Sequence, residues 1–162
     1  MNFDSFEDIK GLMDNFDPAS LLPDLSSMAG IVATITRLAV IVGPLVLLVL
    51  GLLYFFAAPK EANYRFGYRC YFGMGSEEAW RFTQRLAGIL WAALGLVLTI
   101  LMLIISGGYG GKDISQVISS GFRCLIWELV LTGLSVLAIN LLTMLRYDRK
   151  GLRRSGGSKK DL

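Results

Sequence analysis

The sequence predicts an all-α membrane protein with three transmembrane helices and a short amphipathic helix before them. Of the 162 residues, 54% are hydrophobic and only 18% are charged, whereas soluble domains contain about a quarter charged residues. The hydrophobic residues also form three blocks, each long enough to cross a hydrocarbon core of about 30 Å. We therefore predict one membrane domain, residues 31–146, with spans at about 31–57, 86–106 and 122–145.

Residues 1–30 are predicted to be an extracytoplasmic amphipathic segment. Within them, residues 2–16 place hydrophobic side chains at helical spacing with acids between them, before Asp17-Pro18. This helix either lies on the membrane surface or over the bundle, or it docks a partner. The second alternative is considered because helices that bind anionic lipids usually have a basic polar face, whereas this one is acidic. The segment has Lys10 as its only basic residue, unlike the start of a signal peptide, so we expect the first span to be retained.

Basic residues predict the orientation in the membrane. Lys and Arg are frequent in the loop between the first two spans and in the basic tail, residues 147–162, and rare in the other flanks. Cytoplasmic flanks of spans are enriched in these residues. We expect the N-terminus outside, and the first loop and the C-terminus in the cytoplasm. We also expect the basic tail to be mobile.

Composition argues against several functions. The net charge of +3 does not indicate nucleic-acid binding, because basic residues beside spans set topology and contact membrane lipids. The chain has no histidine, and Cys70 and Cys124 fall on opposite sides of the predicted membrane, so we expect no metal site and no disulfide. No nucleophile motif or phosphate loop is present, so we expect neither an enzyme nor a cofactor.

Two charged residues, Arg37 and Glu128, lie inside predicted spans. Each is placed about 10 Å from the outer end of its span, where a lone charge is costly. We predict that an Arg37–Glu128 ion pair clamps the first span to the third. Two alternatives stay open: a polar ligand or ion site, or Arg37 reaching the headgroups while Glu128 pairs with Arg123 or stays protonated.

The first loop is predicted to be an ordered element. Its alternating aromatic residues and arginines match an ordinary interfacial belt, but its glycines, including Gly67, indicate fixed turns. Ser76 is a good helix N-cap with acids in the following turn, so one helix is expected to run from Glu77 into the second span.

The residues of this loop resemble the signature of the SdpI family of bacterial membrane immunity proteins. The matching positions are Asn63, Gly67, Tyr68, Arg69, Ser76, Trp80, Gln84, Arg85 and Gly88. The family usually has a threonine where this chain has Cys70, and its longer members have further spans, so the resemblance covers the core module only. It implies a multi-pass protein of the bacterial cell membrane.

The resemblance also implies protection against a secreted toxic peptide, coupled to signalling through the cytoplasmic loop. A peptide toxin or a protein would then be the partner, beside membrane lipids. Two interpretations of the motif stay open. Arg69, Arg85 and Trp80 bind a lipid or anionic ligand, or the arginines stabilise the fold through loop carbonyls.

A small transport or channel subunit is the alternative function. Its path would be lined by Arg37, Glu128 and Asn140. Because three spans cannot enclose a path alone, this alternative requires a homo-oligomer.

Overall fold

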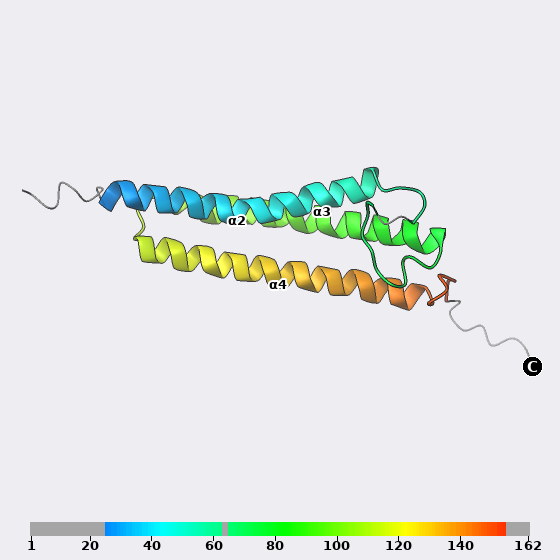
Figure 1. Cartoon of the computed structure of the whole chain (residues 1–162). Helices are drawn as coiled ribbons and strands as arrows, with labels where there is room; N and C mark the ends of the chain where they lie inside the picture. The colour runs from blue at the N-terminus through cyan, green and yellow to red at the C-terminus, as the bar shows by residue number, and fades with distance from the viewer. Residues whose placement is uncertain (1–24, 63–64, 155–162) are drawn as a thin grey trace, which may run out of the picture.

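The computed structural model describes residues 25–62 and 65–154 and confirms the predicted fold class. Its three helices are α2 (Leu25–Phe56), α3 (Glu77–Gly107) and α4 (Ile114–Arg146), with α3 antiparallel to the other two (Figure 1). All three are long and apolar enough to cross a membrane. The predicted amphipathic helix at residues 2–16 lies outside the described residues.

The helices are longer than the predicted spans. Helices of 31 to 33 residues are about 45 to 50 Å long, more than a hydrocarbon core of about 30 Å requires. As expected, α3 begins at Glu77 and continues without a break through the second span. Helix α4 begins at Ile114, eight residues before the predicted third span, so the polar link before it is shorter than expected.

Small residues bring α2 and α3 into close contact. A Cβ atom added at Gly51 would lie 2.2 Å from the Ala92 nitrogen, and one at Gly95 would lie 2.4 Å from the Leu48 nitrogen. At Gly88 it would lie 2.8 Å from the backbone of α2. Glycines at these positions let two helix backbones approach each other where side chains would separate them.

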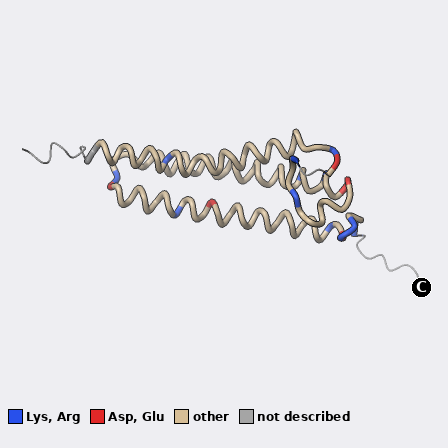
Figure 2. Tube along the Cα trace, in the orientation of Figure 1, with Lys and Arg blue, Asp and Glu red and all other residues tan. Residues whose placement is uncertain are grey.

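Charged residues gather at the two ends of the bundle, and the helices between them carry few (Figure 2). Large hydrophobic side chains face outward on all three helices, for example Ile104 at 70% exposed and Leu129 at 75%. An apolar outer band with charged ends is the pattern of a membrane-embedded bundle. We call the end formed by residues 57–62 and 65–76, the start of α3 and residues 147–154 the loop end.

Candidate functional site

The side-chain amide of Gln84 organises the predicted loop motif. Its Oε1 accepts the Tyr68 backbone N–H at 2.8 Å, and its Nε2 donates to the Tyr68 carbonyl at 2.7 Å. Gln84 is only 2% exposed. Because buried backbone groups need partners, this pair of bonds fixes the loop against α3.

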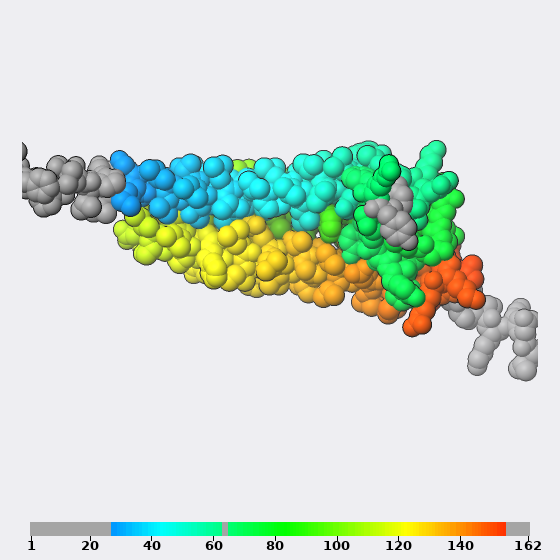
Figure 3. All heavy atoms as spheres, viewed as in Figure 1, coloured from blue at the N-terminus to red at the C-terminus, as the bar shows by residue number. Residues whose placement is uncertain are grey.

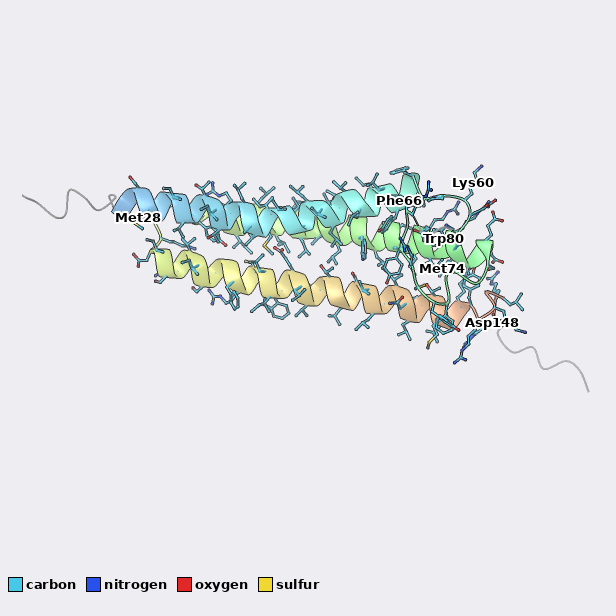
Figure 4. All side chains as sticks on the ribbon, viewed as in Figure 1. Met28, Lys60, Phe66, Met74, Trp80 and Asp148 are labelled. Carbon is cyan, nitrogen blue, oxygen red and sulfur yellow. The ribbon has the colours of Figure 1, made fainter. Side chains whose placement is uncertain are left out.

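Gly67 allows the loop to come this close. Its φ of 121° lies in the region that favours glycine, and a Cβ atom there would lie 2.7 Å from the ring of Trp80. Trp80 itself is fully buried, and its indole N–H donates to the Pro59 carbonyl at 2.9 Å. Trp80 therefore joins α3 to the segment that follows α2, at the loop end (Figure 4).

Tyr68 extends the motif to α4. Its ring meets the Trp91 ring edge to face at 5.4 Å between centroids, and its hydroxyl donates to the Val136 carbonyl at 3.4 Å. Burial raises the pKa of the Tyr68 phenol above its ordinary value of 10.0. The neutral phenol is therefore the form present at physiological pH, and it links the loop to the third helix.

Ser76 is the N-cap of α3, as the sequence predicts. Its Oγ accepts the Ala79 N–H at 3.1 Å, and Glu77 and Glu78 occupy the first turn. The same hydroxyl donates to the Gly151 carbonyl at 2.7 Å. Ser76 thus has a second role, which the sequence did not indicate, because it also holds the segment after α4.

The expectation of a mobile basic tail is wrong for residues 147–154, which fold into a turn that we call the tail hairpin. Tyr147 and Arg153 form an antiparallel bridge. The Asp148 carboxylate accepts the backbone N–H groups of Lys150 and Leu152 at 2.9 and 2.8 Å. An aspartate followed three residues later by Gly151 is typical of a type I turn, and this signal could have revealed the hairpin.

The tail hairpin packs against the start of α3. A Cβ atom at Gly75 would lie 2.6 Å from the Gly151 nitrogen, and Gly151 has a φ of 73°. Tyr147, only 1% exposed, donates through its hydroxyl to the Glu78 carboxylate at 3.1 Å. The hairpin is therefore part of the same folded end as the loop motif.

The two arginines of the motif differ from its other described members, because they are exposed. Neither the Arg69 nor the Arg85 side chain forms a hydrogen bond or ion pair with another described residue. The structure thus gives no support to the interpretation in which they bind loop carbonyls. It also does not bring them into one cleft, since Arg69 lines a separate hollow with Arg149. The first motif residue, Asn63, lies outside the described residues.

Arg85 lines a cleft of about 720 Å³ between the start of α3, the end of α4 and the tail hairpin. We call it the basic cleft, because its walls carry Arg81, Arg85, Arg146 and Arg153. Two of these have partners: Arg81 pairs with Glu77, and the Arg146 guanidinium lies 4.5 Å from the centroid of the Phe82 ring. Exposed guanidinium groups bind carboxylates through paired hydrogen bonds.

Cys70 takes the place of the threonine expected from the resemblance. Its sulfur accepts the Gly73 N–H at 3.3 Å, a bond that a threonine hydroxyl could also accept. Both Cys70 and Cys124 are free thiols, as predicted.

The predicted ion pair between Arg37 and Glu128 is not formed. Arg37 instead donates from Nε and Nη2 to the Ser106 carbonyl, at 3.3 and 3.0 Å. Glu128 packs beside Gly43, six residues or about 9 Å further along α2. The prediction measured the depth of each charge from the end of its own span, but α2 begins six residues and α4 eight residues before those ends, so this count did not fix how the two helices align.

These features define a multi-pass membrane protein whose loop end is an ordered structure rather than a flexible connector. The model of the SdpI/YfhL protein family matches residues 60–144, more than half of the chain. The chain belongs to this family, and membership indicates a role in membrane immunity. No curated protein and no solved structure matches the chain.

Proposed function

We propose that this chain protects a bacterial cell against a secreted toxic peptide and that its loop end is the site that engages a partner. The observation that carries the proposal is the family match, because residues 60–144 include most of the loop end together with α3 and nearly all of α4. The protein would act by binding, since the features described above offer contacts rather than reactive groups.

The motif residues form two groups, one that holds the loop in place and one that is exposed, and this supports the loop end as the binding site. Four motif residues form internal contacts that fix the loop against α3, namely Gly67, Tyr68, Trp80 and Gln84. The side chains of Arg69 and Arg85 form none of these hydrogen bonds with the described residues. Because the loop backbone is already fixed, binding of a partner by these arginines costs less backbone conformational entropy than binding by a flexible loop.

The charge of the basic cleft favours an acidic protein segment as the partner. Four arginines face two glutamates in its walls, and Glu77 is already paired with Arg81. Lys and Arg are more frequent at this end, so we propose that it faces the cytoplasm. A soluble partner could then report the toxin to the cell, which is how the loop would couple immunity to signalling.

The transport alternative gains no support from the arrangement of its three polar residues. Arg37 is bound to the Ser106 carbonyl. Glu128 lies in an apolar groove whose walls include neither Arg37 nor Asn140. These residues therefore do not line one polar path.

Deleting the gene in its own bacterium tests the proposal. The deletion strain should grow poorly in medium conditioned by the parent strain or in a panel of secreted membrane-active peptides. Growth should return when the chain is supplied from a plasmid. Equal growth of both strains under every one of these challenges would overturn the immunity function.

A further inference from the structure

A groove in the middle of the bundle carries one buried carboxyl group. It encloses about 420 Å³ between the three helices, and its lining includes Val46 and Leu47 from α2, Trp91 and Leu98 from α3, and Leu125 from α4. Figure 3 shows green atoms of α3 recessed between α2 and α4. The groove is lined by residues of these same three helices. The volume falls in the range of small-molecule sites.

Glu128 is the acidic residue of this groove, and its carboxyl group has no hydrogen-bond partner in the part of the chain that the structure describes. The side chain is 8% exposed, and its Oε1 is buried without a hydrogen-bond partner among the described residues. Its Oε2 lies against α2, 2.9 Å from where a Cβ atom at Gly43 would be. An unpartnered carboxyl inside an apolar bundle is costly and marks a functional position.

The surroundings of Glu128 do not supply a cation. Arg37, the basic residue predicted to pair with it, is engaged by the Ser106 carbonyl. Lys and Arg are absent from the groove lining. The Glu128 carboxyl is therefore the one ionisable group among the described residues that line this groove.

We propose that this groove binds a lipophilic ammonium ion, with the charged head at Glu128 and the hydrocarbon body along the apolar walls. The carboxylate supplies the charge complement that selects a cation over a neutral lipid. The Trp91 ring, also in the lining, is a suitable neighbour for a cation. Because the outer faces of the helices are apolar, a ligand of this kind reaches the groove from the bilayer.

Photo-crosslinking of the full chain in lipid nanodiscs tests this site. The probe is an alkylammonium carrying a photoreactive diazirine, and the matched control is the corresponding neutral alcohol. The ammonium probe should label groove residues on α2 and α4, mapped by mass spectrometry. Glu128→Gln should reduce that labelling at least about tenfold and leave labelling by the alcohol unchanged. Glu61→Gln, which removes an exposed loop carboxyl, should change neither.

A second variant, Val46→Trp, tests the same groove if Glu128→Gln accumulates poorly. Val46 is 52% exposed at the groove, so Val46→Trp fills the hollow and keeps the carboxyl. It should also abolish groove labelling by the ammonium probe. Equal labelling by ammonium and alcohol, or ammonium labelling that survives in the variants that accumulate, would overturn the assignment.

Discussion

The amide of Gln84 contacts both backbone polar groups of Tyr68, accepting from its N–H at 2.8 Å and donating to its carbonyl at 2.7 Å. A side chain of α3 thereby supplies the hydrogen-bond partners that a loop residue would otherwise find in a β-strand or helix. The aromatic ring of Tyr68 is then directed between α3 and α4, where it meets Trp91 and the Val136 carbonyl. The order of the loop depends on this pairing.

Replacing Gln84 with leucine should destabilise the protein by about 2 to 4 kcal/mol, because two buried backbone groups of Tyr68 would lose their partners. The same replacement at Gln116, which is exposed on α4, is the matched control and should have little effect. Thermal unfolding in detergent, followed by circular dichroism, measures both. Equal unfolding temperatures for the two variants would contradict the role given to Gln84.

Gly67→Ala should destabilise the loop by about 1 to 3 kcal/mol, because the residue has a φ of 121° and its new Cβ atom would meet Trp80. Gly110→Ala is the control, since that loop glycine has no atom within 4 Å of the added Cβ and no positive φ. Limited proteolysis of the first loop reports the difference. A loop equally resistant to protease in both variants would show that the close approach of Gly67 is unimportant.

Exchanging the charges of Arg37 and Glu128 should not rescue either single variant. Arg37→Glu removes the two bonds to the Ser106 carbonyl, and an arginine at position 128 cannot restore them. The amount of folded protein in membranes is the measurement. Accumulation of the double variant at the wild-type level, with both single variants lost, would show that the two residues pair with each other and would contradict the role given to the Ser106 carbonyl.

Alkaline pH should loosen the tail hairpin. Burial raises the pKa of Tyr147 above its ordinary value of 10.0, and its neutral phenol donates to Glu78. For a group whose folded pKa is raised, the stabilisation is complete below the unfolded value and is lost as pH rises through the folded value. Tyrosinate absorbance, compared between wild type and Tyr147→Phe, should assign to Tyr147 a pKa above 10.0. A value at or below 10.0 would refute the buried position.

Much of the fold could be predicted from the sequence because bilayer thickness and backbone hydrogen bonding leave few choices for long apolar segments. The Ser76 cap and the continuous helix from Glu77 were predictable for a similar reason, since local chemistry decides them. The start of α4 was harder to predict, because the polar residues there conceal a helix that begins before the apolar block.

The contacts between distant segments could not be predicted in this way. The pairing of Ser76 with Gly151 joins residues 75 positions apart, and no local pattern reports it. Arg37 donates to the backbone carbonyl of Ser106. Every residue has such a carbonyl, so a search for a side chain of opposite charge led to the wrong partner, Glu128. The motif arginines were recognised as candidates, but their exposure became visible only in three dimensions.

Substitution of the motif arginines tests the central claim most directly. The double variant Arg69→Ala, Arg85→Ala should accumulate and unfold like the wild type, because neither side chain forms a hydrogen bond or ion pair with another described residue. Arg154→Ala is the matched control, an exposed arginine in the tail hairpin. In the deletion strain grown in conditioned medium, the account predicts that the control protects fully and the double variant does not. Full protection by the double variant at wild-type protein level would contradict it.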